Sequence, residues 1–213
     1  TIASIYFWLP NINNKTNGDL KQQLSYFKQA KAWIIVAVIS IGTGGLFSWI
    51  TYISPMVTKV GGLQEDRVPF IMVLVGLGMF IGNILGGKLA DTISPTKAAI
   101  ACFTTMALTL VTVYFTAHIT SLAYVMAFVT GLVAFTIGSP LQMMLITSAK
   151  GSENIAAAAG QASFNIGNTL GAYLGGIPIT LGYAYNSPVL VGVGMAGIGA
   201  MLVTVYLKRF LVR

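Results

Sequence analysis

The stretch Gly160–Gly176, GQASFNIGNTLGAYLGG, lies inside a run of 54 residues without a charged side chain, from Asn154 to Leu207. Such a run is typical of membrane-spanning segments, which need about 20 apolar residues each. Yet the stretch also carries three side-chain amides, those of Gln161, Asn165 and Asn168. On a helix with about 100° per residue, the three amides fall within about 60° of one another. The stretch therefore predicts a membrane helix with one polar face.

The composition of the whole chain is that of a membrane protein. Of its 213 residues, 55% are hydrophobic and 8% are charged, whereas soluble domains carry roughly 25% charged residues. Three further uncharged runs cover 32–58, 68–87 and 98–149. The two longest runs have room for two passes each, separated near His118 and before Pro188. We therefore predict an all-α membrane protein with six transmembrane helices, at 32–54, 68–87, 98–117, 121–148, 154–181 and 188–207.

The basic residues predict how these helices are oriented. With six passes, ten Lys and Arg residues fall on one side of the membrane, and only Lys59 and Arg67 fall on the other. Because cytoplasmic loops carry the excess of Lys and Arg, we expect the C-terminus to be cytoplasmic. The net charge of +7 then reflects topology, and we expect no nucleic-acid partner.

The beginning of the chain is expected to belong to a preceding helix. Residues 1–10, TIASIYFWLP, are too few to cross a bilayer and lack the basic start of a signal peptide. We interpret them as the last turns of an earlier transmembrane helix. Residues 11–31 are polar and rich in lysine, which indicates a cytoplasmic linker. Residues 32–213 then form the six-helix bundle, whose partner would be a part of the protein missing from this chain.

Glycines recur at every fourth position in the second helix of each half of the predicted bundle. They are Gly78, Gly82 and Gly86 in the first half, and Gly167, Gly171 and Gly175 in the second. Such stripes let helix backbones approach closely in lipid, and their matching positions favour a repeated transporter architecture. Glycine is also frequent in membrane helices that belong to no repeat, so the sequence leaves that alternative open.

The amides have two interpretations. In the first, the amides form hydrogen bonds between helices, and each stabilises helix association by about 0.6–2 kcal/mol. In the second, the amides line a water-filled cavity. Three amides in register favour a cavity, and an amide donates and accepts hydrogen bonds without charge, which suits a neutral polar solute. Asn83 and Gln142 extend the predicted lining to two other helices. Gln142 follows Gly138-Ser139-Pro140, which should kink its helix.

Two aromatic residues near the outer end of the first helix, Trp49 and Tyr52, are candidates for the same cavity. The alternative for both is an aromatic belt at the membrane surface. The predicted spans contain no Asp, Glu, Lys or Arg, the side chains that usually couple transport to ions. They also lack the Ser/His pair or the paired carboxylates of an intramembrane protease. We expect no enzyme activity, and with one cysteine in the chain we expect neither a metal site nor a cofactor.

Several motifs carry a resemblance to a known family. They are YFWLPN (6–11), ITYISPMV (50–57), FIMVLVGLGMFIGNILGGKLAD (70–91), SPLQMMLITSAKG (139–151) and the glycine-rich stretch quoted above. With them, essentially the whole chain resembles the C-terminal half of major facilitator superfamily transporters, in particular the AraJ-type sugar (arabinose) efflux permeases of the twelve-helix drug:proton antiporter group. The resemblance implies that the six helices are helices seven to twelve. It also implies an N-terminal six-helix bundle that completes a central cavity.

The resemblance further implies a conformational-switch loop made of Gly87, Asp91 and Lys97. Gly87–Asp91 matches the second copy of the family's Gly-x-x-x-Asp cytoplasmic motif, in which Asp91 would latch the inward-closed state. Thr92 replaces the expected arginine, and Lys97 keeps the positive charge of the motif. The alternative is a solvated carboxylate paired with Lys88 or Lys97.

These observations favour a secondary active transporter of a bacterial inner membrane. We expect it to export a sugar or a small drug-like solute in exchange for protons, by alternating access. The resemblance implies that the proton-coupling carboxylate lies in the N-terminal half. Two alternatives stay open: an uptake symporter with the same fold, and a non-transporting receptor or scaffold protein whose amides only hold helices together.

Overall fold

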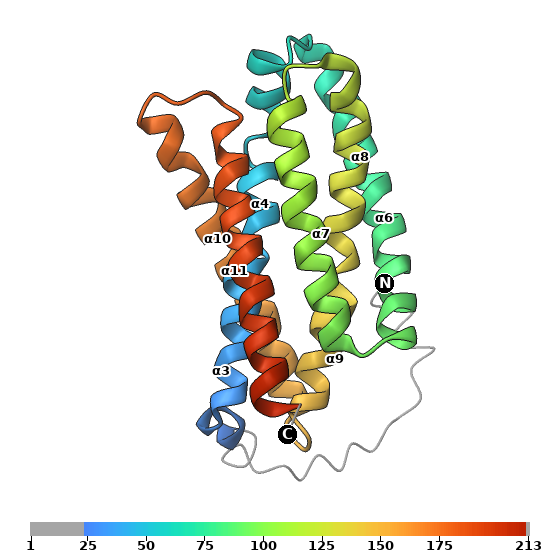
Figure 1. Cartoon of the computed structure of the whole chain (residues 1–213), viewed down its shortest axis with the longest axis vertical. Coiled ribbons are helices and arrows are strands. Elements are labelled where there is room, and N and C mark those ends of the chain that lie inside the picture. The colour runs from blue at the N-terminus through green and yellow to red at the C-terminus, as the bar shows by residue number, and fades with distance from the viewer. Residues whose placement is uncertain (1–23, 212–213) are drawn as a thin grey trace, which may run out of the picture.

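The computed structural model describes residues 24–211, and this part of the chain contains helices and short connections but no strand. Its first half consists of a 3₁₀ turn (Ser25–Lys28), α3 (Ala30–Ala37), a π-helical segment (Val38–Gly42), α4 (Gly44–Ile50), α5 (Ile53–Pro55), a second π-helical segment (Met56–Val60), a 3₁₀ turn (Glu65–Arg67) and α6 (Val68–Thr92). It continues with α7 (Pro95–Thr116), α8 (Thr120–Thr136), α9 (Gly138–Ser148), α10 (Glu153–Thr180) and α11 (Ser187–Phe210). The long helices run side by side (Figure 1).

The predicted six-helix bundle is confirmed within the described residues. Five helical stretches are long and apolar enough to cross a membrane, namely Ala30–Ile50, Glu65–Thr92, Pro95–Thr116, Thr120–Ser148 and Ser187–Phe210. The sixth, α10, has 28 residues, or about 42 Å at 1.5 Å per residue. It is less apolar than the other five because it carries the amides and many small residues. The predicted end of an earlier helix at 1–10, and most of the linker 11–31, lie outside the described residues.

Two of the predicted helices are interrupted. The kink expected at Gly138-Ser139-Pro140 is confirmed, since α8 ends at Thr136 and α9 begins at Gly138. Pro140 has no N–H to give to the carbonyl of Thr136, which explains the break. The first helix was expected to be continuous over 32–54, but it contains the π-helical segment Val38–Gly42 and is broken again at Tyr52.

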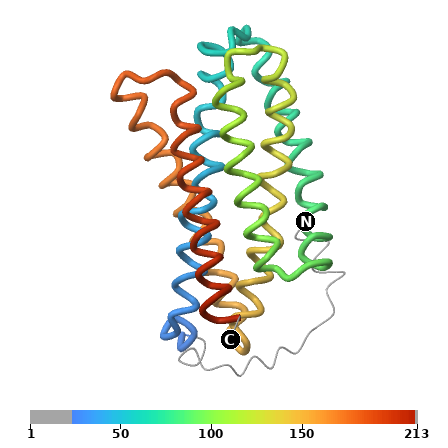
Figure 2. Tube along the Cα trace, in the orientation of Figure 1, coloured from blue at the N-terminus to red at the C-terminus, as the bar shows by residue number. Residues whose placement is uncertain are grey.

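We define the basic end of the bundle as the end where α3 begins and where α6, α9 and α11 end. Lys31, Lys88, Lys150 and Lys208 lie there, and Lys59 lies at the opposite end. At the opposite end, α10 and α11 are joined by a turn in which Gly182 has a φ of +86°, a conformation that favours glycine. Figure 2 shows this turn, orange to red, standing to one side of the other connections at that end.

The two halves of the bundle exchange contacts in matching ways. The second helix of the first half, α6, packs on α8, the first helix of the second half. In the same way α10, the second helix of the second half, packs on α4 in the first half, and the two third helices, α7 and α11, pack on each other. This exchange is what a pair of inverted three-helix repeats would produce.

The glycine stripes lie at these two contacts. A Cβ atom at Gly82 would overlap with the carbonyl group of Leu132 in α8, and one at Gly171 would overlap with the carbonyl oxygen of Gly44 in α4. Gly78 and Gly86 face α8, Gly175 faces Ser48 in α4, and Gly167 faces Thr43 and the π-helical segment just before α4. Glycine is therefore needed where the backbones of α6 and α8, and of α10 and α4, come together.

The outer surface of the bundle carries large apolar side chains. On α6, the exposed ones include Phe70, Val73, Leu77, Phe80 and Ile84, and α11 exposes Leu190, Ile198, Met201 and Val205. A soluble protein rarely exposes such contiguous apolar surface. These faces fit the hydrocarbon of a bilayer, and the buried residues lie between helices instead.

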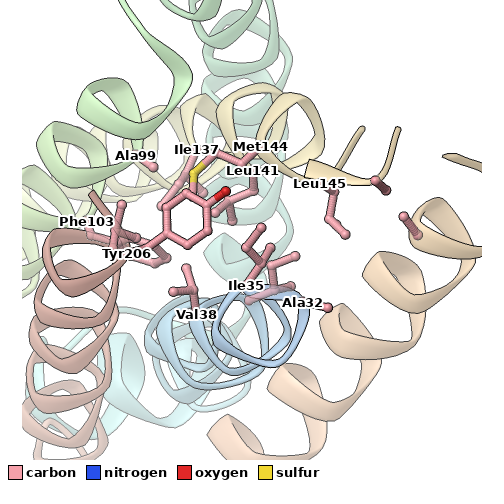
Figure 3. Packing of buried hydrophobic residues seen from close by; sticks show 14 of the residues in the cluster. Ala32, Ile35, Val38, Ala99, Phe103, Ile137, Leu141, Met144, Leu145 and Tyr206 are labelled. Carbon is pink, nitrogen blue, oxygen red and sulfur yellow. The ribbon is translucent and has the colours of Figure 1, made fainter. Parts of the chain in front are cut away.

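A hydrophobic core at the basic end ties the described end of the linker to the bundle. Side chains from α3, α7, α9 and α11 meet around Tyr206 (Figure 3). Tyr26, in the 3₁₀ turn before α3, belongs to the same core and is 2% exposed. Its hydroxyl lies 2.7 Å from Ser148 Oγ, and the single proton of Ser148 goes to the carbonyl of Leu145. Tyr26 is therefore the donor to Ser148, and burial raises the pKa of its hydroxyl, against a smaller lowering by Ser148.

Replacing Tyr26 with phenylalanine should lower the stability of the bundle by about 1 kcal/mol, the usual net value of one buried hydrogen bond. For a protein of this size, the midpoint of thermal unfolding should fall by roughly 2–4 °C. The change is measured on purified protein in detergent. Tyr183→Phe is the matched control because Tyr183 is 66% exposed, and an equal effect of both variants would contradict the anchoring role of Tyr26.

Candidate functional site

A cavity of about 720 Å³ lies among the central helices, in the half of the bundle nearer the basic end. Its wall comes from the α4 region, α6, α7, α8, α9 and α10. The polar side chains of the lining are Thr43, Asn83, Asp91, Ser139, Gln142, Gln161 and Asn165. The volume falls in the range of small-molecule sites, about 300–1,000 Å³.

Four of the predicted cavity residues are brought together here. Asn83 from α6, Gln142 from α9, and Gln161 and Asn165 from α10 all line the cavity. Gln161 and Asn165 are four residues apart and so share one face of α10. Three helices thus direct uncharged hydrogen-bonding groups toward one space.

Asn168 does not belong to this lining. It lies on the same face of α10 as Gln161 and Asn165 and is exposed as they are, but it is about one turn farther from the basic end. The assignment of Asn168 to a solute cavity therefore stays a prediction, because the cavity formed by the described residues ends before it. The helical period fixes the face of a residue but not the depth to which the cavity reaches.

Trp49 and Tyr52 do not line the cavity either, and both have structural contacts instead. Trp49 is 1% exposed and packs in the core toward the end opposite the basic end, together with Ile53 and Met56. Tyr52 donates its hydroxyl proton to the carbonyl of Ala172 at 2.8 Å, which fastens the first helix to α10. Neither the expected cavity nor an aromatic belt describes Trp49, because the side chain is enclosed by neighbouring helices.

Aromatic and sulfur-containing side chains form much of the remaining wall. Phe47, Phe103, Phe135, Phe164, Met106 and Met143 line the cavity between the polar groups. Sequence reasoning missed them because an apolar residue in a membrane helix usually faces lipid or the core. Phe164 was the one with a signal, since it follows Gln161 by three residues and so lies near the same face of α10. Flat apolar rings beside amides bind both the apolar and the hydroxyl-bearing parts of a small solute.

The π-helical segment Val38–Gly42 ends at this cavity. Gly42 and Thr43 line it, and the Thr43 hydroxyl donates to the carbonyl of Ile39 at 2.7 Å. Nearby, Ser40 is buried and its hydroxyl has no hydrogen-bond partner within residues 24–211. π-helical turns are rare and occur frequently at functional sites, and no sequence signal announced this one.

The expected switch loop is mostly helical. Gly87 and Asp91 lie within α6, which continues to Thr92, and Lys97 lies in the first turn of α7. The helix runs past its predicted end at 87 because charged side chains near a membrane surface can extend into water. Only Ile93 and Ser94 connect the two helices, and Ser94 Oγ accepts a hydrogen bond from the backbone N–H of Lys97 at 3.4 Å.

Asp91 is the carboxylate of the cavity. It lines the wall together with Gly87 and Asn83, at intervals of four residues along α6. Within the described residues, Arg67 forms an ion pair with Asp66, with 3.7 Å between Arg67 Nε and Asp66 Oδ2. Asp91 is thus paired with neither Lys88 nor Lys97, and its negative charge lies at the cavity.

The site holds no arrangement for metal chemistry among residues 24–211, since no three His, Cys, Asp or Glu side chains are grouped there. What the geometry provides is a solute-sized open cavity of aromatic rings, amides and one carboxylate, formed between helices of membrane-spanning length. These features are typical of one bundle of a membrane transporter.

The sequence comparisons give the same class. Residues 1–163 match the family model described as Major Facilitator Superfamily, and the chain belongs to that family. AraJ of Escherichia coli (strain K12), a transporter candidate, is 37% identical over 185 residues, which cover 87% of this chain and 47% of AraJ. The inner membrane transport protein YdhP of the same strain is 29% identical over 204 residues, which cover 95% of this chain and 52% of YdhP.

A third relative carries a substrate class in its name. The "Probable sugar efflux transporter" of Helicobacter pylori (strain ATCC 700392 / 26695) is 23% identical over 214 residues, which cover 99% of this chain and 53% of that protein. In all three comparisons the chain spans about half the length of the curated relatives it matches.

Proposed function

We propose that residues 32–213 form the C-terminal bundle of a proton-coupled efflux transporter of a bacterial inner membrane. The observation that carries the proposal is the cavity of about 720 Å³ with amides from α6, α9 and α10. An N-terminal six-helix bundle would face this cavity and complete it. The two bundles would then expose the solute alternately to the two sides of the membrane.

The lining favours a neutral or cationic solute of small size. Amides donate to and accept from hydroxyl groups without carrying charge, and the aromatic rings offer flat apolar surface to a sugar or to a drug-like ring. Asp91 contributes a negative charge that repels anions. The name of the Helicobacter relative agrees with a sugar, and we propose sugars as the first solutes to test.

The orientation follows from the charges. The basic end, with Lys31, Lys88, Lys150 and Lys208, would face the cytoplasm, because positive loops stay on that side. The cavity would then be nearer the cytoplasm, where an exporter collects its solute. Asp91 and Lys97 would lie at the cytoplasmic surface, where we propose that the α6–α7 connection and Gly87 contact the N-terminal bundle in the inward-closed state.

Transport in inverted membrane vesicles tests the direction and the coupling. With the full-length protein and an acidic vesicle interior, we expect a radiolabelled sugar to accumulate inside, opposite to the outward flow of protons. A protonophore should abolish the accumulation. Sugar movement in the direction of proton flow would instead identify an uptake symporter. A protein that carries none of a panel of sugars and fluorescent cationic dyes under any gradient would contradict transport and favour the receptor or scaffold alternative.

A further inference from the structure

A second pocket, separate from the cavity, lies at the basic end between the start of α3 and the α9–α10 connection. It has a volume of about 390 Å³, and its wall includes Lys31, Lys150, Gln29 and Ser152. No carboxylate belongs to this wall, and neither lysine makes an ion pair with any other residue of the described part of the chain. Two positive charges on one pocket that form no ion pair indicate a site for an anion.

The neutral groups of the pocket add hydrogen-bond donors of the kind that phosphate accepts. Ser152 is 7% exposed and lines the pocket, so its hydroxyl is available there as a donor. Gln29 is exposed at the rim, so its amide can also donate. The nearest carboxylate in sequence, that of Glu153, accepts the backbone N–H of Gly151 at 2.8 Å. Two ammonium groups, a hydroxyl and an amide together can satisfy the oxygens of one phosphate.

The pocket lies at the level expected for lipid headgroups. Trp33 follows Lys31 by two residues on α3, is 59% exposed, and donates its indole N–H to the carbonyl of Phe27 at 2.7 Å. Tryptophans held at helix ends in this way mark the interface between hydrocarbon and water. Basic pockets between helices at a cytoplasmic surface bind the headgroups of anionic lipids. We propose that this pocket binds the phosphate of an anionic phospholipid, with Lys31 and Lys150 as its cationic ligands.

The proposal is tested by native mass spectrometry of the full-length protein, titrated in detergent with phosphatidylglycerol or with phosphatidylcholine. We expect retention of phosphatidylglycerol but not of phosphatidylcholine. In the double variant Lys31→Gln/Lys150→Gln the affinity for phosphatidylglycerol should fall about 30-fold, or about 2 kcal/mol at 1.4 kcal/mol per tenfold change. The variant Lys31→Arg/Lys150→Arg should keep most of the affinity.

The matched control is Lys88→Gln/Lys208→Gln, which removes the same charge from two exposed lysines of the same end, outside this pocket. It should leave the affinity within about twofold of the wild type. An equal loss in both double variants would overturn the proposal, because it would show only a general effect of charge. Displacement of the lipid by inorganic phosphate at equal concentration would also overturn it, since the pocket would then select a soluble anion.

Discussion

Efflux by the full-length protein should fall about 30-fold when Gln161 and Asn165 are both replaced by alanine. Both amides line the cavity on α10, and each net hydrogen bond to a solute contributes about 1 kcal/mol. Two lost bonds give about 2 kcal/mol, which corresponds to the expected factor at 1.36 kcal/mol per tenfold change. The measurement is the initial rate of radiolabelled sugar efflux at equal amounts of folded protein in the membrane.

Asn168→Ala is the control for this double variant. Asn168 carries an amide on the same face of the same helix, but it lies outside the cavity lining. The efflux rate of the Asn168→Ala variant should therefore stay within about twofold of the wild type. A loss equal to that of the double variant would mean that the solute path extends farther along α10 than the cavity does. Unchanged efflux in the double variant would refute the role of these amides.

The second large effect is expected at the contact between α6 and α8. Gly82→Ala places a methyl group against the carbonyl group of Leu132, and backbone atoms in a packed helix have no rotamer by which to move away. Overpacking of this kind costs about 2–3 kcal/mol, so the midpoint of thermal unfolding should fall by roughly 5–10 °C. Differential scanning fluorimetry of the purified protein in detergent measures the change.

The same helix provides the matched control in Gly76. Apart from the adjacent residues and the backbone of its own helix, no atom lies within 4 Å of the place that a Cβ at this position would take. Alanine also favours a helix over glycine by about 1 kcal/mol, so Gly76→Ala should leave the midpoint unchanged or raise it. If the midpoint of thermal unfolding were the same for Gly82→Ala as for Gly76→Ala, this would contradict the close approach of α6 to α8.

Much of the fold was predictable because membrane helices have a strong sequence signal. Runs without charge gave the number of helices, Pro140 gave the break between α8 and α9, and the glycine stripes gave the surfaces of α6 and α10 that contact other helices. The π-helical segments were not predictable. Val38–Gly42 packs against α10 and α11 and has no proline that would announce a break.

The candidate site was predictable in its amides but not in its walls. A polar side chain in a membrane helix avoids lipid, so Asn83, Gln142, Gln161 and Asn165 could be assigned to the interior from sequence. Phe47 or Phe103 could equally face lipid, the core or a cavity, and only the packing of the helices decides. The same ambiguity applies to Trp49 and Tyr52, which do not belong to the lining of this cavity.

Asp91 was predicted to lie in the loop after the second helix, and not at the cavity. Lys88 ended the uncharged run, and the predicted helix therefore stopped at Gly87, one turn before Asp91. Because α6 continues to Thr92, the carboxylate comes into register with Asn83 and Gly87 on the cavity face. One extra turn of helix thus gives the lining its negative charge.

The accessibility of position 165 to water tests the cavity most directly. Cys102 is the single cysteine of this chain, so a full-length protein without its native cysteines, Cys102→Ser included, gives a background for Asn165→Cys. Ile166→Cys is the control, because Ile166 is an apolar side chain 48% exposed on the same helix. We expect a membrane-impermeant thiol reagent to label position 165 from one aqueous side and to leave position 166 unlabelled. Protection of position 165 from both sides would contradict a solute cavity and leave the amides as contacts between helices.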